Sequence, residues 1–207
     1  MSAEILNFTP ISGDFTEKHF GEVFNIPLWV KFTDNNFEDW LGCFPQLDQG
    51  FAKVLINSTN ETALVVSGGE CYLIDISEKN LLYKTKDSPL IESVIYTTNP
   101  DYFLVGASYC IYVFDCKTLV KCFQPEFGTD GIYFTGQDGE MAIGHLYAYN
   151  IELEHYVGFE LDLKTFEVEG NRKIKVPFNF TVEQNTNINV TSRKENIIYR
   201  MLKRWFD

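Results

Sequence analysis

The residue types that catalyse reactions or bind metals are few in this chain and seldom lie close together. Histidine occurs three times, and His145 lies near other candidate ligands, namely Glu152, Glu154 and His155. Side chains alternate between the two faces of a strand, so Glu152 and Glu154 would share one face while His155 points to the other. This geometry argues against a shared metal ion, and no C-x-x-C pair offers a zinc site instead.

Sequence motifs for nucleophilic catalysis and for phosphate binding are missing as well. The chain has no G-x-S-x-G nucleophile turn and no G-x-x-x-x-G-K-[ST] phosphate loop. The run Ser67-Gly68-Gly69 is the nearest candidate, and a Gly-Gly pair most simply forms a hairpin turn. We therefore expect a protein that is not an enzyme, with no cofactor and no metal site.

An internal repeat organises the elements that would position any functional residue. The segments Gly69–Thr85, Ser108–Gln124 and His155–Glu169 each place an aspartate at the end of an apolar, aromatic-rich run. A polar turn and a second run follow each time. Because the three aspartates recur so regularly, we expect them to accept hydrogen bonds from backbone N–H groups of the next turn rather than to catalyse. They are Asp75, Asp115 and Asp162. Repeats of this period and shape are typical of blade-like β proteins.

Turn residues and strand-forming residues predict one mainly β domain over residues 1–207. Residues 1–26 are expected to be irregular or a short helix, and residues 27–50 a β-hairpin around an Asp/Asn turn. Residues 51–170 are expected to form three four-stranded antiparallel blades, and residues 171–207 strands and a helix. A single four-stranded sheet is not stable alone, so neighbouring blades must bury each other's faces.

The third blade is expected to differ from the other two, because its copy of the repeat begins later than the spacing of the first two copies would place it. Residues 147–153 and 156–161 would form an extra hairpin that accounts for the longer spacing.

The repeat resembles the WD-repeat β-propeller family. The dipeptides Ile74-Asp75, Phe114-Asp115 and Leu161-Asp162 stand where that family has its Trp-Asp pair. No copy has the tryptophan or the Gly-His pair that begins the family's repeat. The resemblance covers residues 51–170 and implies three to four propeller-like blades. That is fewer than a closed ring usually has, so the resemblance implies an open or half propeller whose exposed sheet ends are natural binding surfaces.

The C-terminal part changes to helical spacing. Apolar residues between Lys194 and Phe206 recur on one face of a helix, and Ser192 with Glu195 fits a capping box. One interpretation is an amphipathic helix that covers an open end of the β stack, with its basic residues paired to the acidic body. A helix that binds a membrane or a partner is the alternative.

The charge of the chain is large and unevenly placed. The formal charge is −12 at pH 7, of which residues 1–171 contribute −17 and residues 172–207 contribute +5. A body this acidic repels nucleic acid and anionic lipid, and it attracts basic proteins. An acidic surface can also serve solubility alone.

Other sequence features concern the compartment. No apolar run is long enough to cross a bilayer, and the first residues do not resemble a signal peptide. The five cysteines show no paired spacing, and Cys71 and Cys110 fall in strand-like runs where a small buried residue is expected. We therefore expect a reduced, cytoplasmic protein.

Two functions of different kinds fit these observations. Small acidic β proteins of this type resemble the immunity proteins of bacterial toxin–immunity pairs, including those of contact-dependent growth inhibition. The resemblance implies a basic, nuclease-type toxin domain whose active site is occluded without catalysis. An intracellular propeller-like scaffold or adaptor for protein–protein interaction is the alternative. A propeller-like hydrolase or lyase would need a histidine or metal constellation that the sequence lacks. The candidate partner contacts are acids in or near loops, namely Glu126, Asp130, Asp138, Glu140, Glu152 and Glu154.

Overall fold

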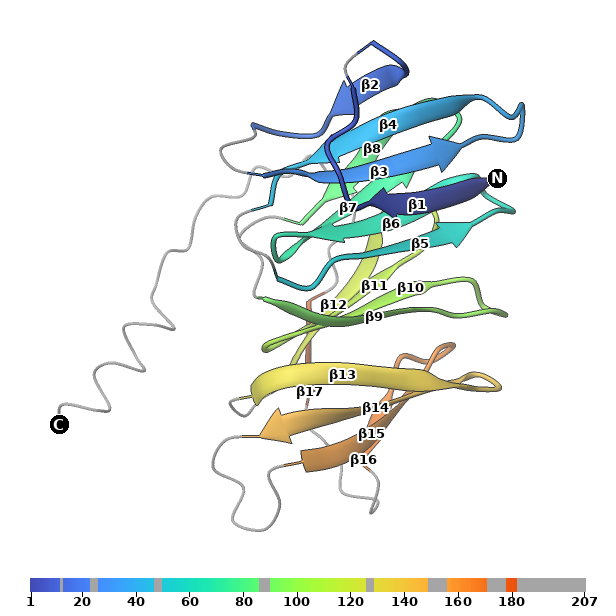
Figure 1. Cartoon of the computed structure of the whole chain (residues 1–207). Coiled ribbons are helices and arrows are strands. Elements are labelled where there is room, and N and C mark those ends of the chain that lie inside the picture. The colour runs from blue at the N-terminus through green and yellow to red at the C-terminus, as the bar shows by residue number, and fades with distance from the viewer. Residues whose placement is uncertain are drawn as a thin grey trace, which may run out of the picture.

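A computed structural model describes residues 1–11, 13–22, 26–46, 50–85, 90–125, 129–148, 156–170 and 178–181. These residues form seventeen β-strands and no helix. The strands make four small sheets stacked one upon another (Figure 1), which confirms the mainly β prediction. The predicted C-terminal helix lies outside the described residues, and within them there is no helix able to cross a membrane.

Sheet 1 contains the predicted hairpin and two strands that were not predicted. Its order is β1-β3-β4-β2, with the bounds β1 Ser2–Leu6, β2 Thr16–His19, β3 Leu28–Thr33 and β4 Asp39–Phe44. β1 pairs antiparallel with β3, and β2 pairs parallel with β4. At residues 2–6 and 16–19 the expectation of an irregular or helical segment is therefore wrong. In β1, Ala3 and Ile5 alternate with the exposed Ser2 and Glu4 and pack on the core, which is the two-residue period of a strand.

Sheets 2, 3 and 4 repeat one antiparallel meander, as predicted for residues 51–170. Sheet 2 consists of β5 Lys53–Asn57, β6 Thr62–Ser67, β7 Glu70–Asp75 and β8 Asn80–Lys84. Sheet 3 contains β9 Ile91–Tyr96, β10 Phe103–Ala107, β11 Ile111–Phe114 and β12 Leu119–Pro125. Sheet 4 contains β13 Thr129–Asp138, β14 Met141–Ala148, β15 Tyr156–Asp162 and β16 Val168–Gly170. The repeat in the sequence therefore corresponds to one sheet per copy.

Two predictions for the last third of the chain need correction or extension. β15 pairs along β14 from Met141↔Asp162 to Tyr147↔Tyr156, so residues 156–161 do not form a separate hairpin with residues 147–153. Full-length pairing places Phe159 and Leu161 of β15 in the core, which explains why it is preferred. A fifth strand, β17 (Phe178–Thr181), pairs antiparallel with β12 and extends sheet 3.

The three repeated aspartates have the predicted structural role. The Asp75 carboxylate accepts a hydrogen bond from the N–H of Glu78 at 2.8 Å. Asp115 accepts two bonds from the next turn at 2.7 and 2.8 Å, and Asp162 accepts two at 2.7 and 2.9 Å. Each aspartate thus closes the turn between the third and fourth strands of its sheet.

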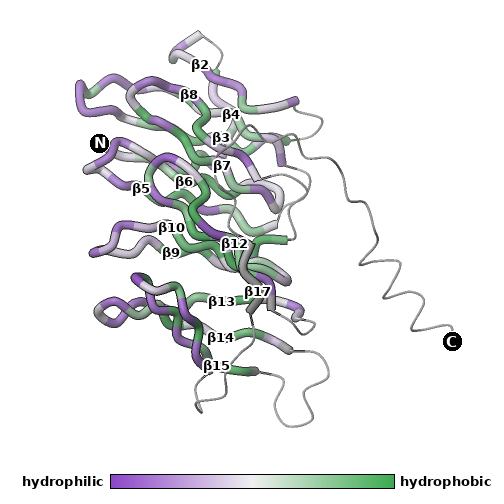
Figure 2. Tube along the Cα trace, turned by 180° about the vertical axis from the view of Figure 1, so that it is seen from behind, coloured by the Kyte–Doolittle hydropathy of each residue, from purple (hydrophilic) through white to green (hydrophobic). Residues whose placement is uncertain are grey.

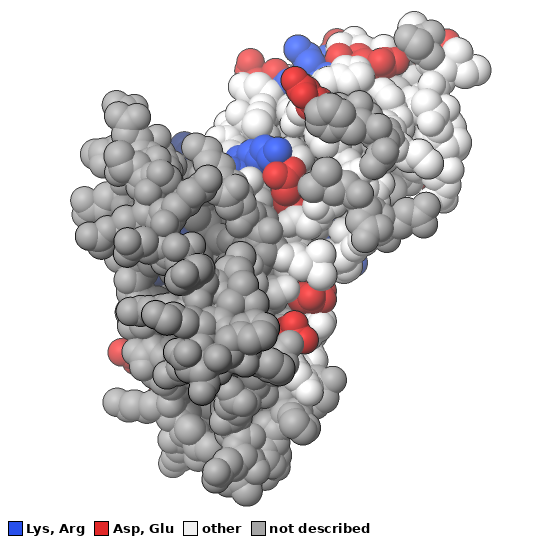
Figure 3. Space-filling view, turned by 90° about the vertical axis from the view of Figure 1, so that its left-hand side faces the viewer, with Lys and Arg blue, Asp and Glu red and all other residues white. Residues whose placement is uncertain are grey.

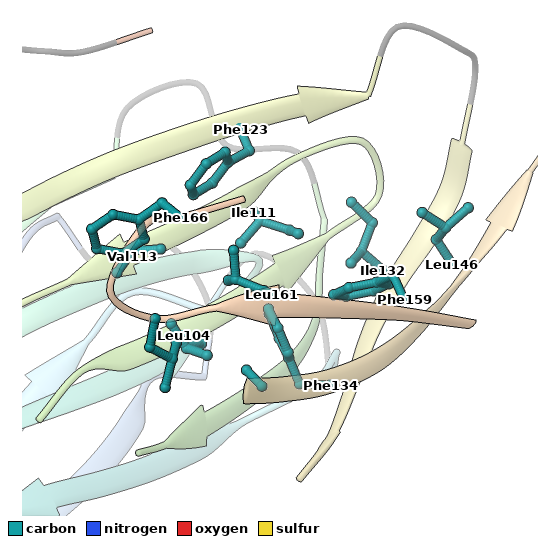
Figure 4. Close-up of a cluster of buried hydrophobic side chains, with 12 residues drawn as sticks. Leu104, Ile111, Val113, Phe123, Ile132, Phe134, Leu146, Phe159, Leu161 and Phe166 are labelled. Carbon is teal, nitrogen blue, oxygen red and sulfur yellow. The ribbon is translucent and has the colours of Figure 1, made fainter. Parts of the chain in front are cut away.

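Apolar side chains fill the three interfaces between neighbouring sheets. Trp40, Phe44 and Tyr72 are fully buried between sheets 1 and 2. Phe103 and Phe114 belong to the interface between sheets 2 and 3. Between sheets 3 and 4, the buried residues shown in Figure 4 come from both sheets and include Leu104, Phe123, Phe134, Phe159 and Leu161. Burial between sheets is the main source of stability, because no sheet has a core of its own.

A direct backbone contact holds sheet 4 against sheet 3. The Ser93 hydroxyl of β9 donates a hydrogen bond to the carbonyl of Ile132 at 3.0 Å and accepts one from the N–H of Phe134 at 2.9 Å. Gly106 of β10 lies beside the same stretch of β13. A Cβ atom there would stand 2.1 Å from the Ile132 carbonyl oxygen, so only glycine allows this approach.

The stack of sheets is open. The first strands of the sheets, β1, β5, β9 and β13, follow one another in a row, and sheets 1 and 4 lie at its opposite ends (Figure 1). This arrangement agrees with the coarse expectation of four small blade-like sheets and shows no closed ring among the described strands. One consequence is a long rim on each side of the row, formed by the turns.

Candidate functional site

The hairpin turns on one side of the stack form a continuous acidic rim, which we call the turn rim. It consists of residues 34–39, 58–61, 75–79, 97–102, 115–118, 138–140 and 162–167. These segments are the hydrophilic tips coloured purple in Figure 2. The turn rim has three bases, Lys79, Lys117 and Lys164, and twelve acids, Asp34, Glu38, Asp39, Glu61, Asp75, Glu78, Asp101, Asp115, Asp138, Glu140, Asp162 and Glu167. Its formal charge of −9 is most of the charge of the whole chain.

Side-chain bonds between neighbouring turns hold the rim in shape. Glu61 accepts hydrogen bonds from Asn35 of sheet 1 and from Ser77 of its own sheet. The Gln137 amide of sheet 4 donates to the carbonyl of Thr98 at 2.8 Å and accepts from its N–H at 2.9 Å, which joins sheets 3 and 4. A rim tied in this way loses little conformational freedom when a partner binds.

Neighbouring groups stabilise the ionised form of two aspartates of the turn rim. Hydrogen bonds from the backbone N–H groups of Thr165 and Lys164 hold the pKa of Asp162 below its ordinary value. A hydrogen bond from Lys31 does the same for the pKa of Asp39, whose carboxylate lies 2.7 Å from the Lys31 ammonium. Both carboxylates are therefore ionised at neutral pH and contribute to the negative potential of the rim.

An exposed aromatic side chain stands among these acids. Phe37 is 86% exposed at the tip of the turn between β3 and β4, and its φ of 62° is left-handed. The Asp34 carboxylate holds this turn by accepting bonds from the N–H groups of Asn36 and Glu38 at 2.8 and 2.9 Å. A phenylalanine in this conformation carries backbone strain and gains nothing from burial. Exposed aromatic residues are common anchors in protein interfaces, so Phe37 makes the turn rim a candidate contact surface.

The structure separates the predicted contact residues into two groups. Asp138 and Glu140 are exposed on the turn rim, where Glu140 pairs with Lys164 at 2.5 Å. Asp130 is exposed near the start of β13, eight residues before Asp138, and therefore about 25 Å from it along the strand. One patch cannot include all three. Glu126, Glu152 and Glu154 lie outside the described residues.

Two hollows adjoin these two groups. One of about 400 Å³ lies on the turn rim between the turns of sheets 3 and 4 and is lined by Thr98, Asn99, Gln137, Gly139 and Glu140. The other, of about 580 Å³, lies at the start of β13 and is lined by Asp130, Tyr133, His145 and Tyr147. No sequence pattern selects Tyr133, Tyr147 or Phe37, because aromatic residues are common in this chain and only strand pairing shows which of them share a face.

Among the residues that the structure describes, no three His, Cys, Asp or Glu side chains come together as potential metal ligands. His145 stacks on Tyr133, with ring centroids 5.2 Å apart. Cys71 and Cys110 are buried as expected, at 1% exposure each. Burial raises the pKa of Cys43 to about 11 and also raises the pKa of Cys71, so these two core thiols are poor nucleophiles.

On the opposite side of the stack, acidic and basic side chains are more evenly mixed than on the turn rim. In Figure 3, which shows this side, the described acids (red) and bases (blue) lie close to one another in several places. Lys84 pairs with Glu70 at 2.9 Å here, near the turn between β6 and β7. Among the described residues the excess of acids is largest on the turn rim, with twelve acids against three bases there and nine against five elsewhere.

Comparison with known proteins adds no assignment. No protein-family model matches the sequence, and no curated protein matches it either.

Proposed function

We propose that this protein is a non-catalytic, cytoplasmic binding protein that engages a basic protein partner through the turn rim. The observation that carries the proposal is the rim itself, with twelve acids against three bases and an exposed Phe37 among them. An acidic surface steers a basic partner and raises its association rate, and an aromatic anchor slows dissociation. Neither role requires a catalytic group.

The partner that fits best is a nuclease-type bacterial toxin domain, so that the protein would act as an immunity protein. A nuclease needs a basic cleft to hold its substrate, because phosphates dominate the affinity for nucleic acid. The acidic, preorganised rim would present to that cleft a negative charge similar to that of the phosphates of nucleic acid. Occlusion of the cleft would neutralise the toxin without any reaction.

A second candidate, an intracellular scaffold or adaptor, is favoured by the free outer edges of the sheets. β17 adds to the outer edge of β12 in sheet 3, whereas the corresponding strands β8 and β16 have no further neighbour among the described strands. Such edges accept extended peptides through backbone hydrogen bonds. Binding of this kind would depend little on salt, which distinguishes it from binding through the turn rim.

The test is affinity capture from source cells at low and at high salt, followed by mass spectrometry and a nuclease assay of the captured protein. The proposal predicts a stoichiometric basic partner at low salt, less of it at high salt, and loss of its nuclease activity in the complex. Capture that is insensitive to salt would favour the scaffold instead. Retention of no protein at either salt would contradict both candidates.

A further inference from the structure

The hollow at the start of β13 is a second surface with its own chemistry, distinct from the turn rim. Its described lining contains two tyrosines, one histidine and one aspartate, and its volume is about 580 Å³. It lies at the end of sheet 4 opposite the turn between β13 and β14. Nothing in the proposed action of the turn rim uses these residues.

Three contacts fix the Tyr133 ring in this hollow. Tyr133 and His145 are direct partners on β13 and β14, and their rings stack at an interplanar angle of 16°. The Tyr133 hydroxyl donates a hydrogen bond to the Glu92 carboxylate of β9 at 3.1 Å. The ring also lies against Gly131, where a Cβ atom would stand 2.7 Å from a ring carbon. The aromatic surface is therefore in place before any ligand binds.

A β-bulge brings a carboxylate to the same hollow. The register of β13 against β14 shifts between Thr129 and Ile132, so one extra residue enters β13 at this point. Without it, alternation would place Asp130 on the face opposite to Tyr133. With the bulge, Asp130 is exposed and lines the hollow together with Tyr133.

We propose that this hollow receives the guanidinium group of an arginine side chain from the basic partner, an assignment that rests on the proposed function. Asp130 and Glu92 disfavour an anion. A flat, delocalised cation stacks on tyrosine and also forms paired hydrogen bonds with a carboxylate, which the compact ammonium of lysine does less well. Stacked aromatic rings beside a carboxylate therefore select arginine over lysine.

A guanidinium group could also come from the chain itself. All four arginines of the protein, Arg172, Arg193, Arg200 and Arg204, lie outside the described residues. An arginine of the C-terminal part that entered the hollow would compete with a partner. The experiment must therefore separate an external arginine from an internal one.

The probe is N-acetyl-arginine amide, titrated into the full chain labelled for NMR at its tyrosine and histidine rings. We expect saturable shifts of the Tyr133, Tyr147 and His145 signals, with a Kd on the order of 1 mM for so small a ligand. The citrulline analogue has the same shape without the charge, and it should cause no saturable shift.

Two aspartates on one strand supply a matched pair of variants. Asp130→Asn should weaken binding of the probe by about ten-fold, since a charge-assisted hydrogen bond is lost. Asp138→Asn removes the same charge at the other end of β13 and should leave the affinity unchanged. Both side chains are exposed, so neither change should affect folding.

Different outcomes of the titration would overturn the guanidinium site, the partner as its source, or the proposed function. Equal binding of the citrulline analogue, or unchanged affinity in Asp130→Asn, would overturn the assignment. Binding of the probe only after Arg172, Arg193, Arg200 and Arg204 are changed to Gln would show that one of the chain's own arginines fills the hollow, which overturns the partner as the source. Binding of the probe to the full chain without any captured basic partner would refute the proposed function and leave the guanidinium site standing.

Discussion

Replacing Gly106 with alanine should strongly destabilise the protein, because sheets 3 and 4 meet there backbone to backbone. The added Cβ would stand 2.1 Å from the Ile132 carbonyl oxygen and 2.6 Å from the Ser93 hydroxyl. Neither neighbour can move away cheaply, since the Ile132 oxygen belongs to the backbone of β13 and the hydroxyl bridges two of its groups.

The expected magnitude follows from two costs. Overpacking of a tight contact costs about 1–3 kcal/mol. Separation of the strands would also disrupt the two hydrogen bonds of Ser93, each with a net contribution of about 1 kcal/mol. Gly106→Ala should therefore lower the free energy of unfolding by about 3–5 kcal/mol.

Urea unfolding followed by far-ultraviolet circular dichroism measures this change, because strands of all four sheets contribute to the signal. Gly136→Ala is the matched control, since a Cβ at Gly136 meets no atom within 4 Å. Its free energy of unfolding should stay within about 0.5 kcal/mol of the wild type. Equal stability of Gly106→Ala and Gly136→Ala would refute the close contact between β10 and β13.

Three further predictions concern the turns and the thiols. Phe37→Asn should raise the free energy of unfolding by about 1 kcal/mol, as asparagine tolerates a left-handed backbone, while it weakens capture of the partner. Asp162→Ala should destabilise by about 0.5–1 kcal/mol at neutral pH through the loss of two bonds to backbone N–H groups. The pKa of Asp162 is lowered in the folded state, so its contribution to stability is fully present above the pKa of the unfolded state and is lost as the pH falls through the pKa of the folded state. The free energies of unfolding of the wild type and of Asp162→Ala should therefore converge in acid. In the native protein, maleimide should label Cys116 and Cys122 but not the buried Cys43, Cys71 and Cys110, whereas mass spectrometry should show labelling of all five after unfolding.

Local signals explain what the sequence could predict. The Asp-capped turns and the strands of residues 51–170 depend on neighbouring residues, and the hairpin between β3 and β4 follows from its Asp/Asn turn. The regular recurrence of Asp75, Asp115 and Asp162 was a reliable sign of a structural role. The division of residues 51–170 into three four-stranded antiparallel meanders was therefore predicted correctly.

Long-range pairing explains what the sequence could not predict. β2 lies parallel to β4, and β17 returns to β12 from more than fifty residues away, so no local pattern reveals either pair. The hollow depends on the pairing of Tyr133 with His145 and on the bulge at Asp130. A shift of one residue in the pairing of β13 with β14 would move these side chains to the other face of the sheet, and the sequence alone does not specify the register so finely. The exposure of Phe37 likewise depends on where its turn stands relative to sheet 2.

The measurement that tests the central claim most directly compares two charge variants of equal size in partner capture and association kinetics. The rim variant combines Glu38→Gln, Glu78→Gln, Asp138→Asn and Glu167→Gln. The control variant combines Glu22→Gln, Glu160→Gln, Glu169→Gln and Asp14→Asn, four acids outside the turn rim. All eight side chains are exposed.

Both variants change the net charge of the chain equally, so only the position of the charge differs. If the turn rim binds the basic partner, the rim variant should associate about ten-fold more slowly than the wild type at low salt, and the control variant should stay within about two-fold. Equal slowing of both variants would show that net charge alone attracts the partner and would contradict binding at the turn rim.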